Sequence, residues 1–283
     1  MRGVWRQLLC LAGGAAITLA GCGAPPEPSP LVVGAATDPG STVLAHVYAA
    51  ALRSSGAAVQ VHRAADPLAD LDSGALGVVA GFTGRLLAVF APGALVRSDR
   101  AVYRAMVGAL PEGIAAGDYA TGAQDKPALA VTGATAARWA GTELRAVAEH
   151  CAGLTVGALA GTSYPTEVGR CRLPEERRFR DTAALFAALR AGRISAAWVS
   201  TADPGTPADM VLLADDKPAL VRAENVVPLY RRNELAEAQL LAINQVAGVL
   251  DTAALIDMRR RVEDGADPQT VADAWLAEHP LGR

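Results

Sequence analysis

The chain has few aromatic residues, few histidines and no recognisable catalytic motif. Its 283 residues include four Trp, five Tyr and four Phe, so aromatic residues make up only 5% of the sequence. It has no G-x-S-x-G elbow, no G-x-x-x-x-G-K loop and no C-x-x-C pair. The four histidines lie far apart, and His46 and His62 occupy amphipathic positions that favour a structural or solvated imidazole. We therefore expect no enzyme, no metal site and no cofactor, although distant histidines can still assemble a site.

Long apolar runs and an excess of positive charge are also missing. Beyond the first 21 residues no run approaches the roughly 20 apolar residues of a transmembrane helix, so any work across a bilayer is expected from partners. The chain has 26 basic and 29 acidic residues, a formal charge of −3. Arg2 and Arg6 belong to the predicted leader, which leaves 24 basic and 29 acidic residues and a charge of −5. This balance argues against a nucleic-acid-binding protein.

The amino terminus has the pattern of a bacterial lipoprotein leader. Arg2 and Arg6 give a positive start, residues 8–19 form a short apolar stretch, and Leu19-Ala20-Gly21-Cys22 reads as a lipobox. We predict that residues 1–21 are removed as a signal peptide and that Cys22 is lipidated, which anchors the protein on the extracytoplasmic face of the cell membrane. The alternative is cleavage elsewhere, with Cys22 left as an ordinary thiol.

A proline-rich tether and one large folded part follow the predicted leader. Residues 22–30 contain four prolines and almost nothing to bury, so they are expected to be extended. The roughly 250 remaining residues suffice for one large domain or for two lobes of about 100 to 150 residues each.

Two cysteines remain for the folded part. Cys10 lies in the leader and Cys22 is the predicted lipidation site, so Cys151 and Cys171 are left together in an oxidising compartment. We predict that they form a disulfide. Two buried free thiols are the alternative, because sequence alone does not give the distance between the Cα atoms.

Apolar runs and helical patterns alternate along the chain. Expected strands at 31–35, 58–62 and 75–79 are separated by expected helices at 42–52 and 66–71. A second alternation of strands (128–131, 154–157, 195–199) with helices (144–151, 182–189) fills the middle of the chain. After an apolar run at 226–229 the pattern is wholly helical, over 235–250, 252–262 and 269–278. This order predicts an α/β fold with mostly parallel sheets covered by helices.

Several short segments, in order and over about 250 residues, give the chain a likeness to a known family. They are Val32-Val33-Gly34, Gly81-Phe82-Thr83-Gly84, Ala128 to Thr132, Ser200 to Pro204, Leu213 to Lys217, Glu224 to Pro228 and Glu278 to Leu281. On these segments the chain resembles the substrate-binding lipoproteins of glycine betaine, choline and carnitine ABC importers.

The resemblance implies a two-lobed periplasmic-binding-protein-like fold of type II, with a ligand cleft between the lobes and two hinge strands. Residues 31–127 and 229–283 would form lobe 1 and residues 128–228 lobe 2, with crossings near Asp125 to Leu129 and Asn225 to Leu229. The lobes would close on the ligand by a hinge motion.

The same resemblance implies an aromatic cage for a quaternary ammonium group, and this chain departs from it. The usual tyrosine of the Tyr-Thr-Gly turn is Phe82, and the small polar residue after the glycine is Arg85. Pro127 replaces an expected aromatic residue, and Trp198, or Val199 without a one-residue shift, takes the place of another. Arg85 would repel a cation or would hold a carboxylate or phosphate; alternatively, it is a solvated helix residue.

Further candidates lie at predicted strand ends or turns, where α/β sheets place their ligands. Asp38 and Asp203 serve equally well as helix caps or turn formers, and Trp198 equally well as a core residue. The candidate ligand-binding residues are Asp38, Ser41, Phe82, Thr83, Arg85, Asp125, Trp198, Ser200, Thr201, Asp203 and Asn225.

Together these observations favour a monomeric, lipid-anchored solute-binding protein that delivers a small osmolyte-like solute, a quaternary amine or related zwitterion, to an ABC permease with a separate ATPase. One alternative is an envelope scaffold or regulatory lipoprotein that kept the fold and lost the ligand. A second, an enzyme using Asp125 and Asp203 for acid/base work, is disfavoured because it needs a converging carboxyl pair with one raised pKa.

Overall fold

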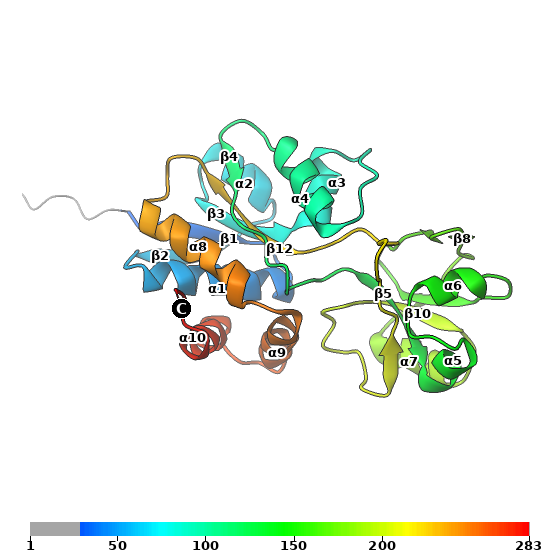
Figure 1. The fold of residues 1–283 in the computed structure, drawn as a ribbon. Helices are drawn as coiled ribbons and strands as arrows, with labels where there is room; N and C mark the ends of the chain where they lie inside the picture. Colours follow the sequence, from blue (N-terminus) through cyan, green and yellow to red (C-terminus); the bar gives the residue numbers. More distant parts are fainter. Residues whose placement is uncertain (1–28, 283) are drawn as a thin grey trace, which may run out of the picture.

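The computed structural model describes residues 29–282, which form two α/β lobes side by side (Figure 1). The two-lobed α/β architecture expected from the sequence is confirmed. The predicted signal peptide, Cys22 and most of the tether lie outside the described residues.

Lobe 1 contains a five-stranded sheet in the order β2-β1-β3-β12-β4. Successive residues of a strand point to opposite faces of the sheet. Val33, Val78 and Val226 accordingly belong to the buried cluster on one face, and Val79 and Val227 to the cluster on the other. Both faces of this sheet are therefore covered, as the near-continuous apolar strands require. The strands are β1 Leu31–Ala35, β2 Val59–Arg63, β3 Val78–Phe82, β4 Ile114–Ala116 and β12 Val226–Arg231.

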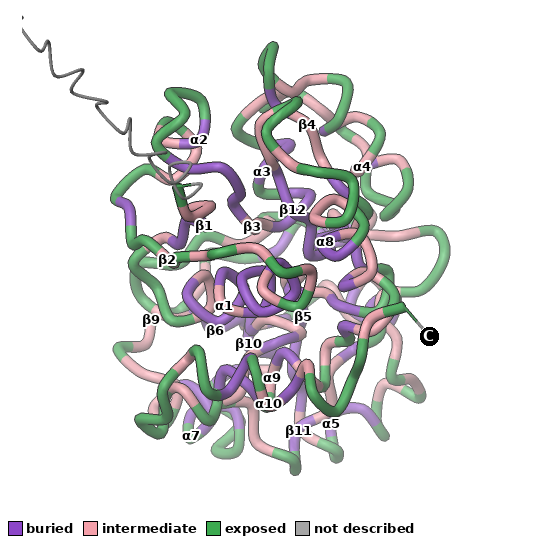
Figure 2. The backbone as a smooth tube through the Cα atoms, turned by 90° about the vertical axis from the view of Figure 1, so that its left-hand side faces the viewer, coloured by how far each residue is buried: buried purple, intermediate pink, exposed green. Residues whose placement is uncertain are grey.

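Two groups of helices cover this sheet. On one face lie α1 Pro39–Ser54, α8 Glu237–Val249, α9 Thr252–Glu263 and α10 Pro268–Glu278. On the other lie α2 Pro67–Ser73, α3 Thr83–Phe90 and α4 Asp99–Gly108. Helix α1 packs against α8, α9 and α10 and is buried over most of its length, so that Figure 2 draws it mainly in purple. The expected helical carboxyl-terminal region is confirmed.

Lobe 2 contains the second five-stranded sheet, in the order β11-β5-β10-β6-β9, and a small hairpin. Helix α7 packs on one face of this sheet, and α5, α6 and the hairpin lie on the other. The strands are β5 Pro127–Thr132, β6 Val156–Leu159, β7 Glu167–Val168, β8 Cys171–Arg172, β9 Arg177–Phe179, β10 Ala196–Ser200 and β11 Met210–Leu212. The helices are α5 Gly133–Arg138, α6 Arg145–Glu149 and α7 Thr182–Arg190.

Three helices begin with the same Asp-Pro pair. Asp38, Asp66 and Asp267 each cap a helix by accepting a hydrogen bond from a backbone N–H three residues on, and proline occupies the next position. Proline has no N–H to lose there and its fixed φ suits the first turn, so this pair marks a helix start in sequence.

The expectation of mostly parallel sheets is wrong, because both sheets are mixed. In lobe 1, β1 pairs in parallel with β2 and β3, whereas β12 runs antiparallel to β3 and β4. In lobe 2, β10 is parallel to β6 but antiparallel to β5. Strands β5 and β12 are the ones that follow a crossing between lobes, and each enters its new sheet in the opposite direction to its neighbours.

The two crossing segments run side by side and antiparallel between the lobes (Figure 1). Gln124 and Asn225 form a β-bridge, and the Asp125 N–H donates to the Glu224 carbonyl over 2.9 Å. Strand β12 starts at Val226, so residues 226–228, assigned to lobe 2 from the sequence, lie in the first sheet.

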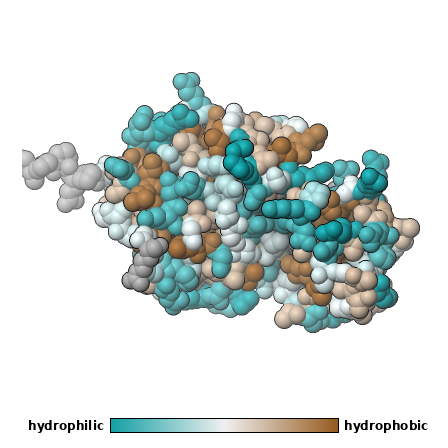
Figure 3. All heavy atoms as spheres, in the orientation of Figure 1, coloured by the Kyte–Doolittle hydropathy of each residue, from teal (hydrophilic) through white to brown (hydrophobic). Residues whose placement is uncertain are grey.

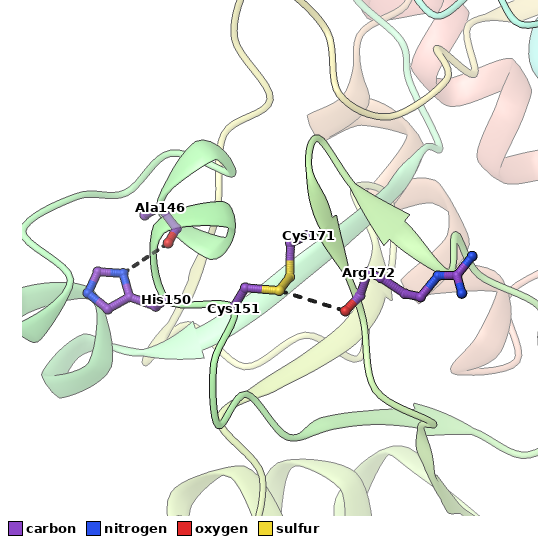
Figure 4. Close-up of a disulfide and its surroundings, with 5 residues drawn as sticks. All are labelled: Ala146, His150, Cys151, Cys171 and Arg172. Atoms are coloured by element: carbon purple, nitrogen blue, oxygen red, sulfur yellow. Dashed lines mark hydrogen bonds between the residues drawn. A yellow bond between two sulfur atoms is a disulfide. The ribbon is translucent and has the colours of Figure 1, made fainter.

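The disulfide between Cys151 and Cys171 is present, with Cα atoms 5.6 Å apart (Figure 4). It ties the end of α6 to the small β7–β8 hairpin, which has little core of its own. In residues 29–282 we find no single helix long and apolar enough to cross a membrane; α8 and α9 together meet the length and composition but are bent by 100°.

Candidate functional site

A buried carboxylate stands where the two lobes meet. Asp125, on the first crossing segment, is 4% exposed. Its Oδ2 accepts hydrogen bonds from Arg85 Nη2 and Arg259 Nη2, each over 3.0 Å, and its Oδ1 accepts one from the Ser200 hydroxyl. Arg85 comes from α3 and Arg259 from α9, both in lobe 1, whereas Ser200 ends β10 in lobe 2. Asp125 is therefore bound by side chains of both lobes.

The guanidinium groups keep this carboxyl ionised. Burial by itself raises the pKa of Asp125, but the hydrogen bond and charge of Arg259, the charge of Arg85 and the hydrogen bond from Ser200 together outweigh burial. The net result is a pKa below the ordinary value for aspartate.

Phe82 lies beneath both arginines. It ends β3, is 5% exposed, and its ring centroid is 4.5 Å from Arg85 Cζ and 5.8 Å from Arg259 Cζ. Both distances are within the range of a cation–π interaction. The aromatic ring predicted for a solute cation is thus next to two cations of the chain itself.

Glu224, on the second crossing segment, caps the start of α3. Its Oε2 accepts from the Arg85 N–H over 2.8 Å, and a Cβ on Gly84 would come within 2.6 Å of its Oε1. Glycine at position 84 is therefore what lets this carboxyl reach the helix. Burial raises the pKa of Glu224 to about 7, against the opposing effect of Arg85.

Hydrogen bonds at the crossings use three of the predicted site residues. Thr83 and Asn225, both fully buried, exchange hydrogen bonds, with the Thr83 N–H donating to the Asn225 carbonyl and the Asn225 N–H to the Thr83 hydroxyl. The Thr201 hydroxyl accepts from the Lys126 N–H and donates to the Gln124 carbonyl. Thr83, Thr201 and Asn225 thus fix the backbone around Asp125.

Three other predicted residues, Asp38, Ser41 and Asp203, lie at a helix start or a turn. Asp38 is the N-cap of α1, and its carboxylate is taken up by the N–H and hydroxyl of Ser41. Asp203 accepts from the Gly205 N–H in the loop after β10, and burial raises its pKa. The structure therefore gives both aspartates the capping and turn geometry that the sequence allows.

Trp198 lies in the core of lobe 2, with its side chain fully buried. Its ring stacks on Tyr164, with centroids 5.4 Å apart and ring planes inclined by 2°. The partly exposed Tyr164 continues this stack towards the lobe boundary: burial raises the pKa of its hydroxyl, and the charges of Asp203 and Asp125 raise it further.

Sequence reasoning missed Arg259, Glu224 and Tyr164. The position of Arg259 could have been recognised in the sequence. It lies four residues after Leu255 and one after Met258, on the buried side of α9, where an arginine needs a partner. Glu224 precedes a buried apolar strand, which is only a weak indication of a site residue. Tyr164 lies in an irregular loop, and no sequence pattern indicates its role.

One cavity, of about 420 Å³, lies beside the crossings and is lined in part by Arg97, Gln124, Lys126 and Asp215. Lys126 and Asp215 form a shielded ion pair over 3.1 Å, with side chains 15% and 3% exposed. Within residues 29–282 there is no cluster of three or more His, Cys, Asp or Glu that could hold a metal ion.

Replacing Asp125 by asparagine should destabilise the protein strongly. The Asp125→Asn variant leaves the Arg259 guanidinium buried without its counter-ion, a change that typically costs about 3 kcal/mol or more. Urea unfolding measures the loss. Asp209→Asn is the matched control, because Asp209 pairs with Arg190 at an exposed site, where loss of an ion pair has little effect on stability. Equal effects of the two substitutions would contradict a central role for Asp125.

Replacing Glu224 by glutamine should change how stability depends on pH. A folded pKa raised from 4.5 to about 7 stabilises the fold fully below pH 4.5, and this contribution is lost as pH rises through 7. Glutamine lacks the contribution at every pH. From pH 5 to pH 8 the Glu224→Gln variant should therefore gain stability relative to the wild type, by on the order of 1 to 3 kcal/mol.

Urea unfolding at pH 5, 6.5 and 8 tests this expectation. Glu112→Gln provides the reference, because it removes a carboxyl of the same type at an exposed position. A stability difference between Glu224→Gln and the wild type that does not change with pH would disprove the raised pKa.

The family model described as the substrate binding domain of ABC-type glycine betaine transport systems matches residues 29–160 and 175–278. No curated protein sequence matches the chain significantly.

Among solved structures, the apo form of YehZ from Escherichia coli is similar with a TM-score of 0.70 and 18% identity, over 89% of this chain and 99% of that one. A glycine betaine/carnitine/choline ABC transporter structure gives a TM-score of 0.73 and 16% identity, over 88% and 98% of the two chains. At these identities the structures establish the fold alone. The family match extends over most of the chain and confirms the resemblance found in its sequence segments: the protein belongs to the substrate-binding family of ABC-type glycine betaine transport systems, whose members bind solutes and are not enzymes.

Proposed function

We propose that this chain is the lipid-anchored, extracytoplasmic solute-binding protein of an ABC importer. It captures a small osmolyte-like solute, a quaternary amine or a related zwitterion, and delivers it to a permease driven by a separate ATPase. It acts as a monomer. Cys22 carries the lipid, and the proline-rich segment after it spaces the lobes from the membrane.

The observation that carries this proposal is the Asp125 cluster. Its members come from α3, α9, the first crossing and β10, and they meet where the lobes join. The surface along this junction is mainly hydrophilic or neutral in the view of Figure 3. A solute bound there would contact both lobes at once, so its binding energy would favour the arrangement in which they are closest.

The predicted residues divide into two groups on this basis. Those we propose for solute contact surround the junction: Phe82, Arg85, Asp125, Ser200 and Asp203. Those we propose to position the site are engaged in hydrogen bonds or packing: Asp38, Ser41, Thr83, Trp198, Thr201 and Asn225.

One observation favours a second candidate function, an envelope scaffold or regulatory lipoprotein without a ligand. The Arg85 guanidinium lies 4.5 Å above the Phe82 ring and donates to Asp125, so groups of the chain itself occupy positions where a solute would be held. A site filled in this way needs no solute to be stable.

Ligand-dependent unfolding of the exported full chain, purified in mild detergent, separates the two candidates. Glycine betaine, choline, carnitine, amino acids and organic phosphates are screened one at a time. A solute present at 100 times its dissociation constant should add about 2.7 kcal/mol to the free energy of unfolding, because it binds only the folded chain. If no solute shifts the transition, the scaffold function replaces the transport function.

The anchor is tested separately by fractionating cells that express the Cys22→Ala variant. Without the thiol there is no site for a lipid, so the exported protein should move from the membrane fraction to the soluble extracytoplasmic fraction. Cys10→Ala is the matched control, because Cys10 lies in the predicted leader and its loss should leave the mature protein on the membrane. A Cys22→Ala protein that stays with the membrane would contradict lipidation at this residue.

A further inference from the structure

The ring face of Phe82 already has a cation on it. The Cζ atom of Arg85 is 4.5 Å from the ring centroid, well within the roughly 6 Å at which a cation interacts with an aromatic face. Arg85 is held there by two hydrogen bonds from Nη2, one to the Asp125 carboxylate over 3.0 Å and one to the Asp125 carbonyl over 3.1 Å. A solute ammonium group would have to displace this guanidinium to reach the same face.

Some N–H donors of the two arginines form no hydrogen bond with residues 29–282. A guanidinium carries five N–H donors and no acceptor. Both hydrogen bonds of the Arg85 side chain to described residues come from Nη2, and this side chain is 55% exposed, so Nε and Nη1 can reach a solute. Arg259 is only 8% exposed, and its buried Nε has no hydrogen-bond partner among residues 29–282.

The surroundings of Arg259 favour an acceptor rather than another donor. Its Nη1 donates to the Ala202 carbonyl and its Nη2 to Asp125, both over 3.0 Å, which leaves Nε as the unsatisfied group. Leaving a buried N–H unpaired costs about 1 to 3 kcal/mol. The Nε atom would lie 3.1 Å from a Cβ on Gly40, in the first turn of α1, where the helix dipole favours negative charge.

The two guanidinium groups share one carboxylate. Both contact Asp125, and within residues 29–282 neither guanidinium forms another ion pair. The Glu224 carboxyl is engaged with the start of α3, the Asp203 carboxyl with the loop after β10, and the Asp38 carboxylate with Ser41. Two positive charges therefore share a single paired carboxylate.

We propose that Arg85 and Arg259 form an anion subsite, which selects solutes by a carboxylate or phosphate group, and that Arg85 on the Phe82 ring excludes a solute whose only charged group is a quaternary ammonium. This inference rests on the proposed solute-binding function and specifies the solute class of that site. It assigns a ligand-binding role to Arg259, which the sequence did not single out.

Titration calorimetry on the exported full chain tests the proposal with three probes: choline, succinate and inorganic phosphate. The wild type should bind succinate or phosphate, and the tighter of the two identifies the anion as carboxylate or phosphate. The Arg85→Thr variant should bind that anion at least ten-fold more weakly and should bind choline at least ten-fold more tightly than the wild type, because the ring face becomes free.

Arg190→Thr is the control: Arg190 is similarly exposed (48%) and also paired with an aspartate, but it lies at the end of α7, so binding should be unchanged. Arg85→Gln, which keeps most of the side-chain length, is measured in parallel in case Arg85→Thr does not fold. Arg85→Gln should weaken binding of the anion in the same way.

Other outcomes overturn the inference. The inference is contradicted if the wild type binds choline as tightly as Arg85→Thr does, or if the substitution leaves anion binding unchanged. Either result leaves a solute-binding function intact. Binding of none of the three probes by any form contradicts the inference, and the proposed function with it if the wider solute screen is also negative.

Discussion

The structure depends on a single buried carboxylate at the junction of the lobes. An ionised side chain that is removed from water loses several kcal/mol of solvation, and only well-placed partners compensate for that loss. Asp125 has three such partners, two guanidiniums from lobe 1 and the Ser200 hydroxyl from lobe 2. The partners in turn fix their own elements: Arg259 orients α9 and Arg85 the start of α3. One residue of the chain thereby constrains two helices, one strand end and the first crossing.

The same cluster determines what any motion of the lobes must disrupt. Arg259 reaches across to the Ala202 carbonyl in the loop after β10, and Ala202 itself is buried in the core cluster of lobe 1. Rotation of lobe 2 away from lobe 1 breaks this contact or carries the loop along. Lys126, next to Asp125, is bound within lobe 2 by Asp215. The ion pairs of the first crossing therefore change from lobe 1 partners to a lobe 2 partner between two adjacent residues, 125 and 126.

Periodic apolar patterns were sufficient to predict most elements of the fold, because each pattern depends on local backbone geometry and on which face is buried. Strand direction was not predictable in this way. Strands β5 and β12 have ordinary apolar sequences, and they run antiparallel to β10 and β3 because each follows a crossing between the lobes. The members of the Asp125 cluster were identified in part. Ser200 was named for its position at a predicted strand end and Phe82 through the family resemblance. Arg259 was not named, because it lies about 130 residues from Asp125 in sequence and its partner is set by the packing of α9 alone.

The aromatic residues and the charges at the junction both argue against a site for a purely cationic solute. Of the two rings considered for a cation, Trp198 has no exposed surface and stacks on Tyr164, and Phe82 lies under Arg85. Both rings therefore already have partners within the chain. Within residues 29–282, Nε and Nη1 of Arg85 and the buried Nε of Arg259 donate no hydrogen bond. Because an arginine cannot lose its proton near neutral pH, these donors are present under all physiological conditions. In the proposed anion subsite, selection depends on these positive charges and their donors, and the scarcity of aromatic residues in the sequence is consistent with a site that does not need them.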